Sequence, residues 1–161
     1  MLAWICDLIV ATDDAYFSDP VVRMGIPGVE YFAHPFELNP RTAKEFLFTG
    51  SKMGAERAHQ MGMVYQISSR DSLMDDVTAL ANKVAAAPRL GLALTKQAIN
   101  DIEDLQNKRQ CMEAAFVWHH FAHAPNDLLS GDKLVGSTQR RWRRPISLKR
   151  VDALGLFYPK Q

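Results

Sequence analysis

The chain has 161 residues, 47% of them hydrophobic and 23% charged, and these values exclude a disordered or collagen-like chain. The net charge of +1 hides a division of charge along the chain. Residues 1–132 carry eleven basic and seventeen acidic side chains, whereas residues 133–161 carry eight basic side chains and one acidic. This division predicts an acidic folded domain over 1–130, followed by a basic and loosely ordered tail over 131–161.

The cysteine content and the apolar start bear on the compartment. Cys6 and Cys111 are too few for a disulfide framework or a thiolate zinc site, so the chain is compatible with a reducing compartment, and we expect the cytoplasm. Residues 2–11 are apolar, but they are far shorter than the ~20 residues of a membrane span. They also lack the basic region and the cleavage site of a signal peptide. We therefore expect buried core here and no membrane partner.

Short apolar runs predict the strands. Residues 8–12 form such a run and end in two aspartates, as expected of a buried strand followed by a turn. Residues 15–18 form a second short segment, which stops before Pro20, and residues 63–67 are the third strand candidate. These strands are too few for a full sheet. The chain is therefore either a mostly helical domain or part of a larger α/β domain.

Longer stretches have helical spacing. Pro40 opens one helix and Gly50 closes it, and Ser72 with Asp75 is the expected N-terminal cap of another. The apolar residues of the later segments recur every three or four positions, which is typical of amphipathic helices. The predicted helices cover 40–49, 55–61, 73–87, about 90–105 and about 108–123.

Several segments, in this order, resemble one family. Residues 2–12 (LAWICDLIVAT) are similar to its segment LA-x-x-CDL-x-VA, and Gly25-Ile26-Pro27-Gly28 resembles its G-x-x-PG loop. Residues 47–64 are similar to its pattern LTG…A-x-x-A-x-x-x-GLV, and residues 88–96 continue as its helix P-x-A-x-x-x-x-K. The family is that of the enoyl-CoA hydratases and isomerases, also called crotonases, and the resemblance covers residues 2–125.

The resemblance implies a fold and a chemistry. The fold is α/β, a partial crotonase-like spiral of ββα units with short strands near 8–18 and 63–67, followed by C-terminal helices. The implied substrate is an acyl-CoA thioester, the implied assembly is a homo-oligomeric trimer or hexamer, and no cofactor is expected because CoA is part of the substrate. In this family two backbone N–H groups hold the thioester oxygen, and acidic residues move protons.

The chain departs from the family at positions that matter for hydration. The family's first half and a glycine-rich turn, which supply the two N–H donors, are expected before Leu2. The two glutamates of the hydratases are replaced by Met1 and Val21. We therefore expect a truncated family member with weak or no hydratase activity. The alternative is a non-catalytic fragment or an assembly partner of a crotonase-like enzyme.

Two carboxylates are candidate catalytic residues. Glu30 lies near the loop where some isomerases of the family carry their single base; alternatively, it is an early-helix carboxylate favoured by the helix dipole. Asp19 precedes Pro20 in a loop that lines the family's acyl pocket; alternatively, it is a turn-forming residue. The residues expected in the acyl-CoA pocket are Pro20, Val21, Gly25, Pro27 and Gly28.

Two further clusters have ordinary alternatives. His119 and His123 share a helix face, but two ligands are fewer than the three or four that zinc requires, so we expect packing and no metal. Protonation near neutral pH is able to make this face pH-sensitive. The basic run 140–144 contains Trp142 and suits phosphates or bases, but no recognition fold accompanies it, so nucleic acid is not an expected partner.

Overall fold

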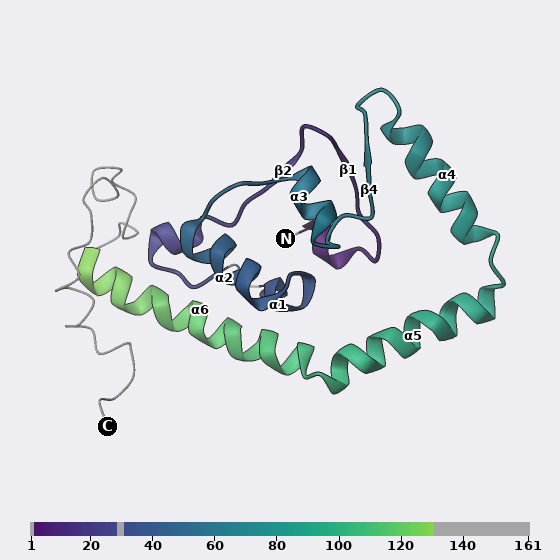
Figure 1. Ribbon diagram of the computed structural model, residues 1–161. Helices are drawn as coiled ribbons and strands as arrows, with labels where there is room; N and C mark the ends of the chain where they lie inside the picture. The colour runs from purple at the N-terminus through teal and green to yellow at the C-terminus, as the bar shows by residue number, and fades with distance from the viewer. Residues whose placement is uncertain (1, 29–30, 131–161) are drawn as a thin grey trace.

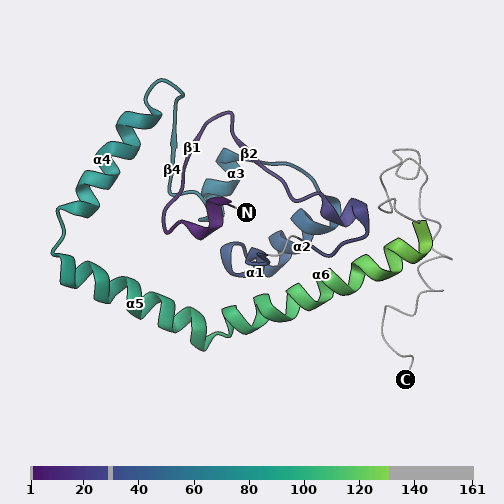
Figure 2. The same ribbon diagram turned by 180° about the vertical axis from the view of Figure 1, so that it is seen from behind.

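The computed structural model describes residues 2–28 and 31–130. Residues 2–68 form a body of short strands and short helices. The helices α4 (Leu73–Ala85), α5 (Arg89–Leu105) and α6 (Lys108–Ser130) then run in turn around its outside (Figure 1). Seen from behind, α6 again lies beside α1 and α2, and α5 again stands away from the body (Figure 2). The other helices are η1 (Leu2–Ile5), η2 (Val21–Met24), α1 (His34–Glu37), α2 (Pro40–Thr49) and α3 (Ala55–Gln60), η denoting a 3₁₀ turn.

The described strands pair into two small sheets. β1 (Val10–Thr12) runs parallel to β4 (Gln66–Ser68), with Ala11 opposite Ile67. β2 (Tyr16–Phe17) runs antiparallel to β3 (Met53–Gly54). The two strand regions expected near 8–18 and 63–67 are thus confirmed, whereas the sequence analysis did not predict β3.

The strand expected over 63–67 begins later than predicted. The backbone N–H groups of Met63 and Val64 both donate to the carbonyl of Ala58, at 3.0 and 3.2 Å. These residues therefore complete the turn that ends α3. The chain is free to pair with β1 only after Tyr65, whose N–H donates to the carbonyl of Ile9 at 2.8 Å.

The helices expected from their periodicity are present, and two details differ. Ser72 does not cap α4 with its side chain, because its own backbone is already helical and its hydroxyl donates to Asp76 instead, at 3.0 Å. The apolar start is also only partly buried. A 3₁₀ turn directs one side inward, so Trp4 is buried whereas Ile5 and Leu8 are 62% and 48% exposed, contrary to our expectation.

The core lies in the body and not under the long helices. Buried apolar side chains from η1, β1, α2, β3 and α3 form one cluster, but none of the residues of α4 and α5 is buried. No helix in the described part of the chain is both long and apolar enough to cross a membrane. The core residues are Trp4, Ala11, Ala33, Leu38, Ala43, Phe46, Leu47, Met53, Ala55, Ala58, Met63 and Val64.

Lys108 ties the start of α6 to two other helices. Its Nζ lies 2.9 Å from a carboxylate oxygen of Glu103 in α5 and 3.3 Å from one of Glu37 in α1. Burial alone lowers the pKa of Lys108, but hydrogen bonds and attraction from the two glutamates outweigh it, so its pKa lies above the usual value. The charged ammonium therefore remains in place at neutral pH and holds α6 beside the body.

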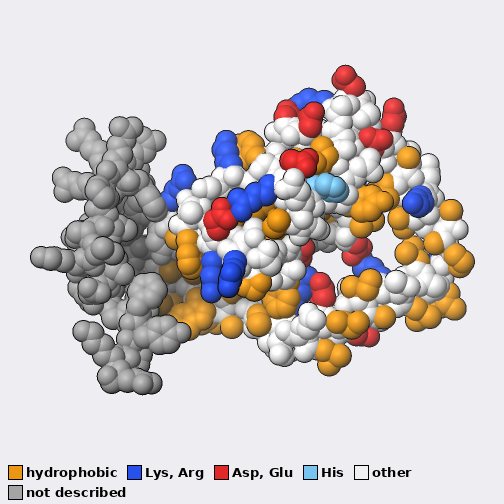
Figure 3. Space-filling view, in the orientation of Figure 1, with side chains coloured by type: hydrophobic (Ala, Val, Ile, Leu, Met, Phe, Trp, Pro, Cys, Tyr) orange, Lys and Arg blue, Asp and Glu red, His pale blue; other side chains and the backbone are white. Residues whose placement is uncertain are grey.

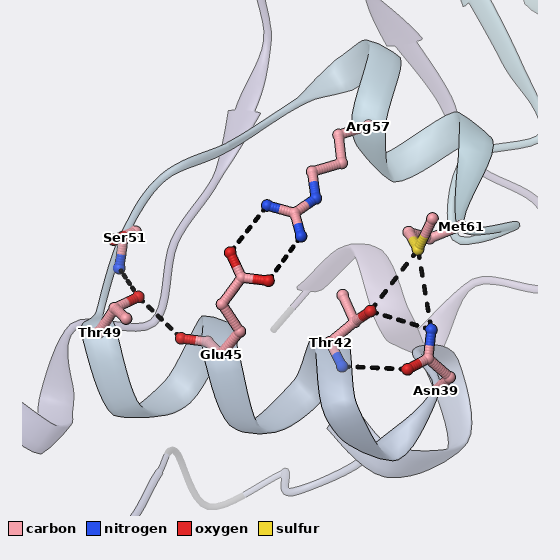
Figure 4. A network of polar contacts seen from close by, with 7 residues as sticks. All are labelled: Asn39, Thr42, Glu45, Thr49, Ser51, Arg57 and Met61. Carbon is pink, nitrogen blue, oxygen red and sulfur yellow. Dashed lines mark hydrogen bonds and ion pairs between the residues drawn. The ribbon is translucent and has the colours of Figure 1, made fainter.

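Polar contacts at both ends of α2 fix its position (Figure 4). At its start, Asn39 Oδ1 accepts the backbone N–H of Thr42 at 3.0 Å, which satisfies one of the free donors of the first turn. Near its middle, Glu45 accepts two hydrogen bonds from Arg57 of α3, at 2.9 and 2.6 Å. At its end, Gly50 adopts a left-handed φ of 55°, and a side chain there would lie 3.2 Å from Pro20 Cα.

The cap of α2 gives a stability prediction. Replacing Asn39 by alanine removes the acceptor for the N–H of Thr42, so we expect the free energy of unfolding to fall by about 1 kcal/mol. Urea denaturation followed by circular dichroism measures the change. The matched control is Arg41→Ala, an exposed residue of the same helical turn, for which we expect a change below about 0.5 kcal/mol. Equal losses in the two variants would contradict the capping role.

Candidate functional site

A cavity of about 240 Å³ lies between η1, β2, α1 and α2. Its lining is mostly aromatic and contains one carboxylate, that of Asp19, and one imidazole, that of His34. Such a mixture of an apolar wall and a few polar groups is typical of small-molecule sites. The lining residues are Ala3, Trp4, Tyr16, Phe17, Ser18, Asp19, His34 and Phe46.

Asp19 enters this cavity from the loop after β2. The residue is only 5% exposed, although aspartate is rarely buried without a partner. Its Oδ1 accepts the backbone N–H of Val21 at 3.3 Å, which is the turn-forming role that we considered as an alternative. Its Oδ2 lies 3.0 Å from Nε2 of His34. Asp19 is thus both a turn former and the carboxylate of the cavity, and its catalytic role stays a prediction.

His34 is a site residue that our sequence analysis missed. It starts α1 before Pro35 and has no exposed surface. Its ring packs against Trp4 at 4.4 Å between centroids, edge to face, and against Phe32 at 4.9 Å. The available signal was the segment 29–34, where the chain departs from the family's usual glycine-rich sequence.

The Asp19–His34 contact is close but not well aligned. The distance of 3.0 Å suits an ion pair, yet the direction of the ring nitrogen does not satisfy a hydrogen bond. The other ring nitrogen, Nδ1, has no hydrogen-bond partner among the described residues. The same holds for the indole Nε1 of Trp4 in the same cavity wall. Catalytic hydrogen bonds are often misaligned without substrate, so this geometry is compatible with a reactive pair.

The residues predicted for the acyl-CoA pocket lie next to this cavity and do not line it. Pro20 and Val21 follow Asp19 directly and lead into η2, and Gly25 ends η2 with a left-handed φ of 77°. A side chain at Gly28 would meet the ring of Phe32 at 2.6 Å and lie 3.9 Å from Asp19 Oδ2. A glycine is therefore required where the loop passes the carboxylate.

Two expectations fall outside the part of the chain that the structure describes. Glu30 lies between residues 28 and 31, and the basic run 140–144 lies in the tail beyond residue 130. The roles of both stay predictions, as does the division of the chain at residue 130. Pro27 belongs to the described loop 25–28, and its part in an acyl-CoA pocket also stays a prediction.

The histidines of α6 pack against the same loop. His119 is buried, and its Nδ1 lies 2.7 Å from the carbonyl oxygen of Gly28, which confirms the packing role. His123 Nε2 is 3.3 Å from His119 Nε2. Within residues 2–28 and 31–130, no group of three or more metal-ligating side chains comes together. The histidines thus connect α6 to the loop that passes Asp19.

The cavity is suited to proton transfer at an otherwise apolar ligand. A carboxylate in a largely apolar, low-dielectric site interacts more strongly with a developing charge than one in water. The indole N–H of Trp4 offers a donor that no described residue uses. A ligand with an acidic C–H and an oxygen acceptor therefore matches the polar groups of the wall.

The comparisons with known proteins agree with this site. The family model of the enoyl-CoA hydratase/isomerase family matches residues 1–128. A Mycobacterium tuberculosis protein described as an enoyl-CoA hydratase (EchA13) is 40% identical over 139 residues, which are 86% of this chain and 44% of that protein. The chain thus spans less than half the length of this curated relative.

Solved structures give the same result. The crystal structure of a protein described as an enoyl-CoA hydratase from Mycobacterium smegmatis is 44% identical, with a TM-score of 0.77 over 80% of this chain and 52% of that one. A carnitinyl-CoA hydratase from Mycobacterium avium, 21% identical, matches 92% of this chain and 57% of that one with a TM-score of 0.72, which shows a shared fold. The expected crotonase-like architecture is thus confirmed, and the chain belongs to the enoyl-CoA hydratase/isomerase family.

Proposed function

We propose that the chain binds an acyl-CoA thioester and moves a proton next to the thioester carbonyl, with Asp19 as the base. The observation that carries this proposal is the buried carboxylate of Asp19 in the wall of a cavity, within the segment that the family model matches. CoA belongs to the substrate, and the proposal requires no further cofactor.

The proposed step follows from the acidity of the carbon next to a thioester. The carboxylate of Asp19 takes the proton from this carbon, so a C–H bond breaks and an O–H bond forms. The electron pair of the C–H bond moves toward the thioester oxygen and forms an enolate. Return of the proton to the same carbon gives exchange, and its return to the γ-carbon of an unsaturated acyl chain gives isomerisation.

Hydration makes a further demand that this cavity meets poorly. Addition of water to an enoyl thioester needs a group that activates the water as well as one that protonates the α-carbon. Asp19 is the carboxylate of the cavity wall, and the following position that is glutamate in the hydratases is Val21. We therefore propose weak hydratase activity beside faster proton exchange.

The role of Asp19 predicts the effect of an isosteric change. In Asp19→Asn the amide cannot take a proton, so we expect the exchange of the α-protons of butyryl-CoA in D₂O to slow by about 10²–10⁴-fold. Mass spectrometry of the recovered thioester measures the rate. The control is Asp13→Asn, an exposed aspartate before β2, which should exchange as the wild type does. An unchanged rate in Asp19→Asn would remove Asp19 from the mechanism.

Glu30 is the competing base, and the same assay compares the two carboxylates. If Asp19 is the base, Glu30→Gln retains exchange within about threefold of the wild type, since a neighbouring charge is worth much less than the proton acceptor itself. If Glu30 is the base, the two variants exchange places in the result. A loss of exchange in Glu30→Gln alone would therefore transfer the assignment to Glu30.

The missing second carboxylate predicts the ratio of two activities. We expect hydration of crotonyl-CoA, followed by the loss of the enoyl absorbance, to be at least about tenfold slower than α-proton exchange, because water is not activated. The Asp19→Asn variant, purified in the same way, reports any hydratase carried over from the host. Hydration by the wild type as fast as exchange, and absent from the variant, would contradict the proposal.

A second function, as a non-catalytic assembly partner, is favoured by the surface. Apolar side chains gather over α4 and α5 around an opening between α5 and the body (Figure 3). Monomeric proteins rarely expose contiguous apolar patches of this kind. We propose that a further copy of the chain covers this surface. The exposed residues are Met74, Leu90, Leu92, Leu94, Ile99, Ile102 and Leu105.

The assembly proposal has its own test. Leu90 and Ile102 are 72% and 56% exposed, so their replacement by glutamate costs little in the monomer but opposes burial in an interface. We expect sedimentation velocity to show the wild-type chain as an oligomer and the double variant as a smaller species. A stable, well-folded wild-type monomer would contradict this proposal. The exposed residue Lys83 of α4, changed to glutamate, serves as the charge control.

The expected compartment also stays a proposal. Cys6 and Cys111 are both exposed, and no disulfide joins them. Unbridged cysteines are compatible with a reducing environment, which supports a cytoplasmic location.

A further inference from the structure

His34 sits where an imidazole has little reason to be unless it acts on a neighbour. The ring has no exposed surface and lies among the rings of Trp4, Phe32 and Phe46, the last at 6.0 Å between centroids. A phenylalanine would fill such a place without burying two polar nitrogens. The polar nitrogens therefore require a partner, and the structure provides one.

That partner is the carboxylate of Asp19. Nε2 of His34 lies 3.0 Å from Oδ2, and both residues line the same cavity. A carboxylate only accepts hydrogen bonds, so contact with an ionised Asp19 requires a proton on Nε2. A lone pair on Nε2 would either repel the carboxylate or require a protonated Asp19, which cannot act as a base.

Other charged groups near His34 are engaged elsewhere. Glu37 shares α1 with His34, but it pairs with Lys108 of α6 at 3.3 Å. The side chains in ring contact with His34 come from η1, from the segment before α1 and from α2, and none of them titrates. Among the described residues, Asp19 is thus the charged group recorded at contact distance from the imidazole.

We infer that His34 is a positioning residue that donates from Nε2 to Oδ2, and that it keeps Asp19 ionised in its apolar pocket; this inference rests on the proposed function. Burial among aromatic rings favours the neutral carboxylic acid, and an N–H donor opposes that effect. Oδ1 is bound to the backbone of Val21 at 3.3 Å and retains a second lone pair for the proton of the substrate. His34 itself exchanges no proton with the thioester.

Two substitutions separate donation from packing. Glutamine places an amide N–H near the position of Nε2, whereas phenylalanine preserves the ring and removes the donor. We expect His34→Gln to retain the acidic limb of the pH–rate profile for α-proton exchange within about half a pH unit. We expect His34→Phe to move that limb upward by about one pH unit or more, with at least a tenfold loss at pH 6.

A structural role alone predicts a different profile. In that case His34→Phe, which keeps the packing, leaves the acidic limb where the wild type has it, and this outcome would overturn the inference. His120→Phe, an exposed histidine of α6 changed in the same way, controls for the loss of a titrating group elsewhere.

A measurement without turnover keeps the inference separate from the proposed function. Two-dimensional ¹H–¹⁵N spectra of the wild-type chain report which ring nitrogen of His34 carries the proton. A protonated Nε2 at neutral pH, lost or altered in Asp19→Asn, is the expected result. An unprotonated Nε2 would overturn the inference even if the chain is active. A protonated Nε2 in a chain that exchanges no α-proton would preserve the donation and overturn the proposed function alone.

Discussion

The contact between the carboxylate of Asp19 and the imidazole of His34 is the constraint on which this account of the site depends. A carboxylate that is 5% exposed is stable only with a donor beside it, and an imidazole with no exposed surface needs an acceptor. Each residue thus satisfies the other across 3.0 Å. Because both also line the cavity, the interaction that stabilises the fold there is the one available for chemistry.

The rest of the body holds these two residues at that distance. The cap at Asn39 and the bonds from α3 fix α2, which brings Phe46 against His34 and Gly50 against the loop after Asp19. From the other side, His119 of α6 holds the carbonyl of Gly28. The loop that carries Asp19 is therefore held at both of its ends by helices distant in sequence.

The sequence predicted the helices and the family well because their signals are local. Periodic apolar residues, Pro40 and Gly50 mark α2 in any context, and the order of the family segments is read directly along the chain. The strands were less well placed, since the start of β4 is set by bonds from Met63 and Val64 back to α3. His34 was missed because its significance arises only when Asp19, 15 positions earlier, is folded against it.

The most direct measurement is a crystal structure of the chain with a non-reactive acyl-CoA thioether. The account predicts that the acyl part occupies the cavity between Trp4 and Phe46, with its α-carbon in contact with the carboxylate of Asp19 and with Nε2 of His34 still on Oδ2. Density for the acyl part outside this cavity, or an Asp19 turned away from it, would contradict the account.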